Sequence, residues 1–584
     1  MPESAPTQVG RVRHVLGGTV TVALDEELAG IAPVFRGRLQ PIGQIGSLVR
    51  IPQGLVDLLG TVTLVGISEL VGGQPPGDVT HADERWLQVQ LLGEVDRSTG
   101  RFHRGVASYP GLDDPVHFAT ADDLRAVFPP PDDKHVRLGR IASAEEIPAC
   151  LEAGRLVLRH TAVVGSTGSG KTSAVATLLQ AFAQQGWGAA NIVIVDPHGE
   201  YQSALGSVAN VQSVLTRGSG KLRVPYWALP AADILRAFTG TTPGTTALSR
   251  FNDLVVEGRR AFAASAGWVT LDEAAITADT PVPFDLREVW YTLDYENNET
   301  RENKSDPATA RVTRPGDAQD LRPTAFAPYN PGGAAPHKAP LHGAYGTTPE
   351  LLRLGLVDPR LAFMQEPAAD PNRPDPLPDV IAGWLGADQP ISVLDFNGVP
   401  AVATELAIGV VLNLVLQVAM HSPGGGPGVG RPRPILVVLE EAHRYLHDGY
   451  TELAALSANR IAREGRKYGV GLMLVTQRPS ELPHTALAQC GTLIALRLSN
   501  ASDQSTVRAA LPDSVVGLSA LLASLRTGEA VVSGEAIALP GRVLIDLPYP
   551  PPAADDPSLA PWREPPTAPD LTASVAAWRN TYSV

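Results

Sequence analysis

The stretch that most constrains the fold is Gly165–Thr172, whose sequence GSTGSGKT fits the pattern G-x-x-x-x-G-K-[ST]. Glycines let such a loop turn with its N–H groups pointing at phosphates, while the lysine reaches the β- and γ-phosphates and the last hydroxyl binds Mg²⁺. A strand-like run, Leu156–Val164, precedes the loop, and a helical pattern, Ser173–Gln184, follows it. The sequence therefore predicts a P-loop in an α/β fold, with ATP and Mg²⁺ as cofactors.

The predicted nucleotide-binding residues are the loop and the residue that follows it. Thr172 is also a predicted metal ligand, because its hydroxyl would face Mg²⁺. The full set is Gly165, Ser166, Thr167, Gly168, Ser169, Gly170, Lys171, Thr172 and Ser173.

Length and composition set the broad class. A chain of 584 residues is long enough for several domains. Its formal charge of -14 argues against a uniformly basic coat for nucleic acid, although one face or a channel can still concentrate Lys and Arg. Two distant cysteines, Cys150 and Cys490, suggest neither a disulfide framework nor a zinc site. No signal-peptide or membrane-spanning pattern is evident, so we expect a cytoplasmic protein without a membrane partner.

Short β-type runs separated by Gly and Pro fill the first part of the chain, as in Gly18–Leu24 and Leu59–Ile67. This spacing predicts a small β-barrel over residues 1–115, followed by a linker of mixed helix and loop over 116–154. The first part of the core is expected at 155–238. In it, the apolar strand Asn191–Val195 leads into Asp196, His198 and Glu200, which either face the ligand or cap a polar turn.

The remaining chain alternates between helical, loop-like and strand-like stretches. A helical and loop insertion is expected at 239–388, and within it Ser305–His342 has the composition of a long mobile loop. The second part of the core is expected at 389–546, with a long apolar helix at Val402–Met420. A Pro-rich tail at 547–584 either hangs free or braces a neighbouring subunit.

Two adjacent acids follow the apolar run Ile435–Leu439, which places them at the carboxyl end of a strand beside the one that feeds the P-loop. In such a pair the first acid supports Mg²⁺ and the second polarises the attacking water. Glu440 is therefore the predicted metal-side residue and Glu441 the predicted base.

A basic stretch, Arg460–Lys467, precedes the strand Val470–Thr476. Arg463 and Arg466 are candidates for neutralising charge on the γ-phosphate of a neighbouring subunit, because a guanidinium can stabilise that charge. Gln477, at the end of the strand, suits a side chain that hydrogen-bonds the γ-phosphate or the attacking water.

Together these motifs resemble the HerA family of hexameric DNA translocases, within the HerA and FtsK group of P-loop ATPases. The resemblance is carried in order by the P-loop and by Val195–Tyr201, Leu439–His443, Ala462–Gly469 and Val475–Pro479. It implies a RecA-like α/β core preceded by a small barrel similar to the HAS-barrel of that family. The Glu at position 440, where Asp is commoner, and the long insertion depart from the family pattern.

The resemblance also implies how such a protein works. It implies a homo-hexameric ring with ATP bound between subunits and double-stranded DNA in the centre, with Arg466, or else Arg463, reaching the neighbouring site. Arg159 matches a basic position of the family that approaches a phosphate. Family members act with a separate effector, such as a NurA-like nuclease or a sirtuin-like or nuclease antiphage protein.

The function expected from the sequence is an ATP-dependent double-stranded DNA translocase or helicase that powers or regulates an effector, in DNA-end processing or antiphage defence. An ATPase scaffold that switches an effector without processive translocation remains an alternative. A secretion ATPase of the conjugation type is a third.

Overall fold

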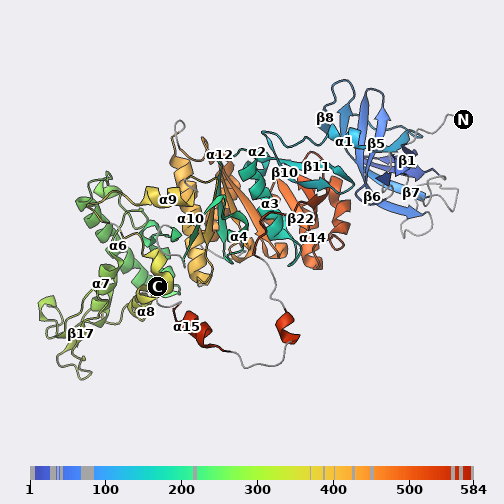
Figure 1. Cartoon of the computed structure of the whole chain (residues 1–584). Coiled ribbons are helices and arrows are strands. Elements are labelled where there is room, and N and C mark those ends of the chain that lie inside the picture. The colour runs from blue at the N-terminus through green and yellow to red at the C-terminus, as the bar shows by residue number, and fades with distance from the viewer. Residues whose placement is uncertain are drawn as a thin grey trace.

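The computed structural model describes three bodies arranged in a row, with a barrel at one end, a large sheet in the middle and a helical insertion at the other end (Figure 1). The residues it describes are 7–25, 34–35, 38–39, 44–67, 85–214, 220–368, 370–385, 388–399, 401–423, 428–446, 453–553, 559–563 and 570–580.

The N-terminal body is a closed antiparallel barrel, as the sequence predicts. Its strands pair in the order β2-β1-β9-β5-β6-β7, and β2 also pairs with β7, which closes the ring of strands. Alternate residues such as Val20, Val22 and Val89 are fully buried in its interior. Its strands are β1 (Gln8–Leu16), β2 (Thr19–Leu24), β5 (Leu48–Gln53), β6 (Val56–Ile67), β7 (Arg85–Asp96), β9 (Pro115–Phe118) and the appended β8 (Phe102–Arg104).

Residues 116–154 do not form the separate linker that the sequence predicts. β9 belongs to the barrel, and a short helix α1 (Ala121–Arg125) follows it. The strands β10 (His135–Ile141) and β11 (Ala144–Glu152) then join the central sheet. The two strands pair with each other as a hairpin, and β10 also pairs with β24 (Gly541–Ile545), which lies near the other end of the chain and attaches the hairpin to the sheet.

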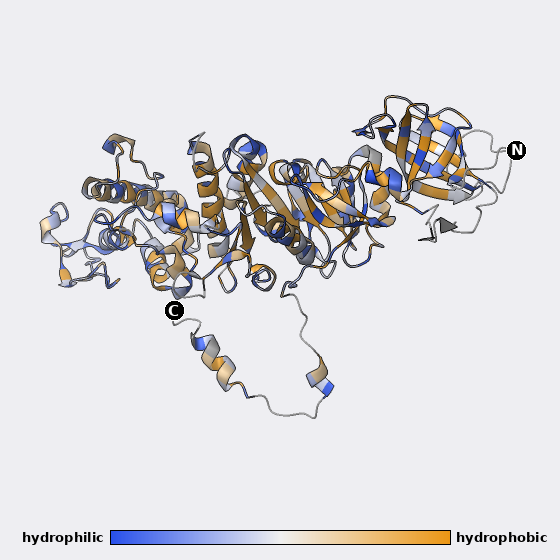
Figure 2. Ribbon diagram, turned by 45° about the horizontal axis from the view of Figure 1, so that its top comes forward, coloured by the Kyte–Doolittle hydropathy of each residue, from blue (hydrophilic) through white to orange (hydrophobic). Residues whose placement is uncertain are grey.

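The central sheet has eleven strands in the order β11-β10-β24-β23-β22-β12-β21-β20-β13-β19-β14. The strands from β22 to β14 run parallel, and the other four continue the sheet antiparallel. The seven parallel strands are mostly apolar, as expected for strands buried on both faces, except the edge strand β14, whose sequence is ANVQS (Figure 2). They are β12 (Thr161–Val164), β13 (Asn191–Asp196), β14 (Ala209–Ser213), β19 (Ile391–Asp395), β20 (Ile435–Leu439), β21 (Val470–Thr476) and β22 (Thr492–Leu496); β23 is Glu529–Gly534.

This strand order corrects one expectation about the acidic pair. The strand that ends at Glu440 and Glu441 is β20, and it does not lie next to the P-loop strand β12, because β21 is inserted between them. Gln477 at the end of β21 therefore lies between the P-loop and the acids. Parallel strands all end at the same edge, so the three motifs still meet there.

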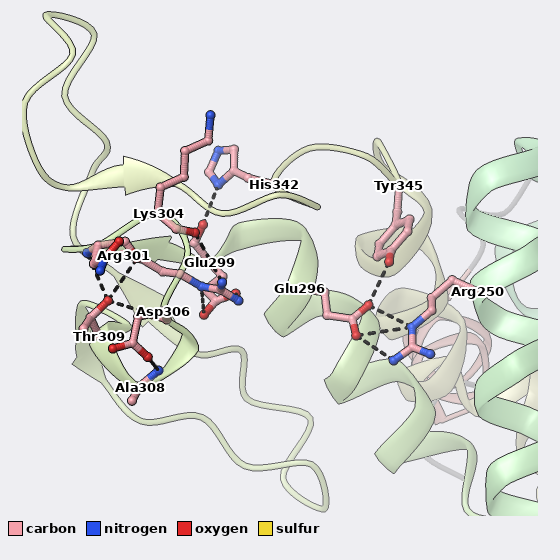
Figure 3. A network of polar contacts seen from close by, with 11 residues as sticks. Arg250, Glu296, Glu299, Arg301, Lys304, Asp306, Ala308, Thr309, His342 and Tyr345 are labelled. Atoms are coloured by element: carbon pink, nitrogen blue, oxygen red, sulfur yellow. Dashed lines mark hydrogen bonds and ion pairs between the residues drawn. The ribbon is translucent and has the colours of Figure 1, made fainter.

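The insertion runs from β14 to β19 and is mainly helical. Its first helix begins at Ala231, so the helical body starts earlier than the predicted boundary at 239. The helices are α5 (Ala231–Thr239), α6 (Thr245–Ser265), α7 (Leu286–Asn298), α8 (Thr348–Val357) and α9 (Leu377–Trp384). Arg250 on α6 and Glu296 on α7 join two of them through a bidentate ion pair, which Tyr345 supports by donating a hydrogen bond to Glu296 (Figure 3).

Residues 305–342 were expected to form a long mobile loop, and the structure adds short strand pairs to what is otherwise mostly turns and irregular chain. Short antiparallel strand pairs run through this region, β15 with β18 and β16 with β17. Polar contacts hold them, including the ion pair of Glu299 with Arg301 and the hydrogen bond between His342 and the Glu299 carbonyl (Figure 3). The pairs are β15 (Thr300–Arg301), β16 (Val312–Arg314), β17 (Ala325–Phe326) and β18 (His337–Lys338).

The long apolar helix of the second core part is α10 (Ala401–His421). In the described part of the chain, it alone is long and apolar enough to cross a membrane, through the window Ala403–His421, yet 72% of that window is buried. It packs against α11 (Leu453–Arg460) and α5. This packing is typical of a core helix.

The tail after β24 first crosses the P-loop helix α3 (Lys171–Gln184) and then leaves the core. Its last described helix, α15 (Thr572–Asn580), lies apart from the core ribbon (Figure 1). Trp562 and Trp578 in this tail are 84% and 64% exposed.

Candidate functional site

The P-loop lies at the carboxyl edge of the sheet, between β12 and α3. Gly168 and Gly170 have φ of 72° and 100°, values that favour glycine, so the pattern's glycines are needed for the turn. The loop is held from outside as well. The Ser166 N–H donates to Arg497 O, and the Gly528 N–H donates to Ser169 O.

The Lys171 side chain is buried at the start of α3 and lies among acids. Burial lowers the pKa of Lys171, and Glu440, Glu441 and Glu200 oppose that shift through their charges. The lysine thus faces all three carboxylates. The placement of Lys171 and Glu441 in one site agrees with the sequence prediction, whose assignment of roles remains a prediction.

Glu440 is enclosed at the end of β20 and is 3% exposed. Tyr201 donates a hydrogen bond to its Oε2 over 2.7 Å. Burial raises the pKa of Glu440 to about 8, although this hydrogen bond and Lys171 favour the charged form. A carboxyl held in this way lies deep beneath the loop rather than at its open face.

Glu441 adopts a left-handed backbone conformation with φ of 51°, which turns its side chain away from the strand direction. Its Oε2 lies 3.2 Å from His443 Nδ1, yet this atom is buried and makes no hydrogen bond among the described residues. His443 Nδ1 also lies 3.0 Å from Thr476 Oγ1 on β21. Burial lowers the pKa of His443 despite the adjacent Glu441 charge, so we expect a neutral imidazole.

Gln477 directly follows β21 and contacts the P-loop. Its Oε1 accepts a hydrogen bond from Thr167 Oγ1 over 2.6 Å. The amide therefore reaches the tip of the loop, on the side where a terminal phosphate would be held.

In the turn after β13, polar residues could either face the ligand or cap the turn, and the structure shows one example of each. Asp196 is fully buried and accepts hydrogen bonds from the N–H groups of His198, Gly199 and Tyr201, so it caps the turn. Glu200 faces the site instead, and its Oε2 accepts a hydrogen bond from Thr172 Oγ1 over 2.9 Å.

The three predicted arginines lie at the opposite edge of the sheet. Arg463 and Arg466 belong to the helical segment that leads into the amino end of β21, and both are exposed without a hydrogen bond or ion pair to the rest of the described chain. Arg159 precedes the amino end of β12 and lies 3.5 Å from Glu535. The expectation that Arg159 approaches a phosphate is therefore wrong for its own P-loop, which lies at the other end of β12.

Several contacts of the site could not be predicted from the sequence. Tyr201 and Glu200 stand in a turn whose side-chain directions a pattern does not fix. Arg497 and Gly528 hold the P-loop through main-chain atoms that any residue possesses. The contact of the Gly528 N–H with the P-loop depends on the order of strands in the sheet, which a local pattern does not give.

The residues present fit a magnesium nucleotide. Thr172 offers a hydroxyl at the start of a helix, and Ser169 Oγ is buried without a hydrogen-bond partner among the described residues. No group of three or more His, Cys, Asp or Glu side chains in the described chain is arranged to hold a metal alone. This agrees with Mg²⁺, which prefers one or two protein oxygens together with phosphate and water.

Comparison with known families agrees with this geometry. The model of the HerA helicase central domain matches residues 136–326, and the model of the HerA-like helicase C-terminal domain matches residues 425–549. Together they cover more than half of the chain, including every motif of the site. The chain belongs to the HerA family of P-loop ATPases.

Two of the relatives are similar over very different lengths. A probable helicase of Methanocaldococcus jannaschii, MJECL08, is 26% identical over 460 residues, which are 78% of this chain and 78% of its own. The DNA double-strand break repair helicase HerA of Pyrococcus furiosus is 47% identical over 112 residues, which are 19% of this chain and 20% of its own.

Among solved structures, VirB4 of Thermoanaerobacter pseudethanolicus is 14% identical, with a TM-score of 0.44, and the match covers 71% of this chain and 97% of that one. The plasmid coupling protein TrwB in complex with the ATP analogue ADPNP is 15% identical, with a TM-score of 0.43, and the match covers 73% and 92%.

Proposed function

We propose that this ATPase of the HerA family is a ring-forming, Mg²⁺-dependent motor that translocates double-stranded DNA in the cytoplasm and drives a separate effector. The observation that carries the proposal is the convergence of Lys171, Glu441 and Gln477 at one edge of the sheet, with exposed arginines at the other edge. Relatives named as DNA double-strand break repair helicases favour DNA as the substrate.

Each residue of the site has its own role in the proposed reaction. Main-chain N–H groups of the loop and Lys171 hold the phosphates, and Thr172 binds Mg²⁺, which offsets the negative charge of the phosphates when bound. Glu441 accepts the proton of the attacking water, and Gln477 orients that water or the terminal phosphate. Glu440 lies behind them on the metal side of the site, and a bound cation would favour its charged form.

An assembled ring explains why the arginines are distant. A guanidinium at the amino edge of one sheet can complete only the site of a neighbouring copy, where it would stabilise charge on the transferring phosphoryl group. Arg466 is our first choice and Arg463 the second, and Arg159 lies at the same edge. A hexamer is the size that we propose, with the barrel as the docking surface for a nuclease or other effector.

The proposal is tested by measuring ATP hydrolysis with and without duplex DNA. We expect DNA to stimulate hydrolysis, and Lys171→Ala and Glu441→Gln to lower turnover by ~10²-fold or more while the assembly persists on a sizing column. Glu535→Gln, at the amino edge, is a matched control that removes a carboxylate elsewhere. Wild-type turnover in Glu441→Gln would remove the assignment.

Motor and scaffold are then separated by a roadblock assay. A translocase displaces a protein bound to the duplex in an ATP-dependent manner. Hydrolysis without displacement would instead favour a scaffold that switches its effector.

A further inference from the structure

Glu200 joins two parts of the molecule that are distant in sequence. Its side chain accepts the hydrogen bond from Thr172 Oγ1 over 2.9 Å, and its main-chain oxygen accepts one from the Ala553 N–H over 3.1 Å. One residue thus contacts both the metal-side hydroxyl of the P-loop and the segment that begins the C-terminal tail.

That segment, residues 546–553, forms a strap across the P-loop helix. Thr177 on α3 donates a hydrogen bond to Asp546 O over 2.7 Å. The Gln180 amide, also on α3, accepts from the Tyr549 N–H and donates to Pro550 O, each over 2.9 Å.

The strap continues to the element that follows Glu200. Ser203 on α4 (Gln202–Leu205) donates a hydrogen bond to Pro551 O over 2.9 Å. The strap therefore ties α3 to the turn that carries Glu200, and its last contact is the one to Glu200 itself.

The chemistry of the Thr172 contact points to the metal. A hydroxyl has one hydrogen and two lone pairs, so a hydroxyl that donates to a carboxylate is left with its lone pairs free to bind a cation. A charged acceptor also makes the donor oxygen a better ligand and fixes its rotation.

Glu440 does not supply this contact. Its Oε2 is engaged by Tyr201, and the acid that Thr172 meets comes from the turn after β13 rather than from β20. The carboxylate that orients the Thr172 hydroxyl is therefore contributed by a different strand from the one that carries the acidic pair.

We propose that Glu200 is the positioning residue that aims the Thr172 hydroxyl at Mg²⁺, and that the strap keeps Glu200 in place for this task. The inference rests on the proposed function, because it requires a magnesium nucleotide at the P-loop. If the inference holds, attachment of the strap strengthens the binding of the magnesium nucleotide. By linkage, binding of the magnesium nucleotide then strengthens the attachment of the strap by the same factor.

The first experiment measures the affinity of the full-length protein for a non-hydrolysable ATP analogue with Mg²⁺ and with EDTA. The ratio of the two dissociation constants reports the metal contribution separately from turnover. We expect Glu200→Ala to reduce that ratio by about tenfold or more, and Glu200→Gln, which keeps an acceptor without the charge, to fall between Glu200→Ala and wild type. Thermal melting shows that each variant is folded.

A wild-type ratio in Glu200→Ala would overturn the inference and leave the proposed function intact. Wild-type protein that binds no nucleotide under either condition would instead overturn the proposed function. The two failures are thus distinguishable.

The second experiment tests the strap. Ala553→Pro removes the N–H that donates to the Glu200 main-chain oxygen and also fixes φ at residue 553. We expect it to reduce the same ratio by about threefold, as the loss of one hydrogen bond would. Pro552→Ala changes the neighbouring residue and leaves that N–H in place, so it should keep the wild-type ratio; equal ratios in the two variants would overturn the role of the strap.

Discussion

At the scale of single residues, the environment of Glu441 is the decisive feature of the site. The side chain projects from a strained backbone position, and the nearest polar group to its Oε2 is His443, which Thr476 holds. A base must be placed within hydrogen-bond reach of the water that it activates. We therefore expect His443 to influence where the Glu441 carboxylate lies.

We expect His443→Ala to lower the turnover of ATP by about tenfold, because the carboxylate of Glu441 then loses the imidazole that lies 3.2 Å from its Oε2. Nucleotide affinity should change little, since His443 does not line the phosphate loop. His421→Ala, at the end of α10, is a matched control whose imidazole contacts only Gln417 O among the described residues. Equal loss of affinity and turnover in His443→Ala would argue for a structural role instead.

A second residue, Asp294, makes the free energy of unfolding depend on pH. Asp294 on α7 is 6% exposed, and its Oδ2 has no hydrogen-bond partner among the described residues. Burial, with a smaller effect of the nearby Glu350 charge, raises the pKa of Asp294 to about 6. The folded chain holds this proton more tightly than the unfolded chain, so the free energy of unfolding falls as pH rises from about 4 to about 6 and stays lower above.

We expect Asp294→Asn to remove this fall, because the amide keeps an acceptor for Asn298 and never ionises. The difference should be on the order of 1 kcal/mol, measured by urea unfolding at about pH 4 and about pH 7. Asp320→Asn, an exposed acid of the same insertion, should keep the wild-type pH dependence. Identical pH dependence of Asp294→Asn and wild type would contradict the prediction.

Motifs located the residues of the site well and their contacts poorly. Lys171, Glu441 and Gln477 meet as expected, because the carboxyl ends of parallel strands share one edge. Glu200 was left open, since a turn does not reveal from its sequence which side chain faces the ligand. Arg159, which the family resemblance places near a phosphate, is separated from the P-loop of its own chain by the full length of β12, and its approach to a phosphate stays a prediction.

At the scale of elements, the close approach of α2 (Ala153–Leu158) to β21 is the tightest packing in the core. A Cβ placed at Gly471 would lie 1.6 Å from the main-chain oxygen of Val157. No side chain fits there, so the helix can cover the sheet only above a glycine.

We expect Gly471→Ala to lower the free energy of unfolding by at least ~2 kcal/mol, because the atom in the way is main chain and cannot rotate aside. Gly154→Ala, on the helix itself, meets nothing within 4 Å and should be neutral or slightly stabilising. Chemical denaturation of both variants checks this. A Gly471→Ala protein as stable as wild type would show that α2 moves freely over the sheet.

Helices and strands could be predicted where their own residues show a regular spacing of apolar side chains. The barrel strands, the P-loop helix and α10 follow from periodicity. The hairpin of β10 and β11 was missed although its pairing is local, and its attachment to the sheet depends on β24, about four hundred residues away, a pairing that leaves little local pattern. The strand pairs within 305–342 were missed because polar contacts rather than apolar burial hold them, so their composition resembles that of a loop.

At the scale of the whole molecule, the two edges of the sheet carry complementary groups. The carboxyl edge holds acids and the P-loop, and the amino edge exposes Arg463 and Arg466. A single copy cannot bring these edges together. Assembly is therefore a condition for turnover in the function that we propose.

We expect Arg466→Ala to reduce turnover by ~10³-fold while the protein still binds nucleotide. Mixing Arg466→Ala with Lys171→Ala, each inactive alone, should restore measurable hydrolysis, because some interfaces then pair an intact P-loop with an intact arginine. Mixing Lys171→Ala with Glu441→Gln is the matched control, and it should restore none, since both defects affect the same edge. Failure of the first mixture to recover would place the arginine outside the neighbouring site.

The outermost strands of the core sheet each have a neighbour outside the sheet. α1 packs against β11, and the last residue of β14, Ser213, pairs with Lys221 as the chain enters the insertion. An open outer strand would invite another copy to add its own strand and so build an unlimited fibre. The assembly that we propose instead joins copies head to tail across the strand ends, a contact that closes into a circle when each step turns by the same angle.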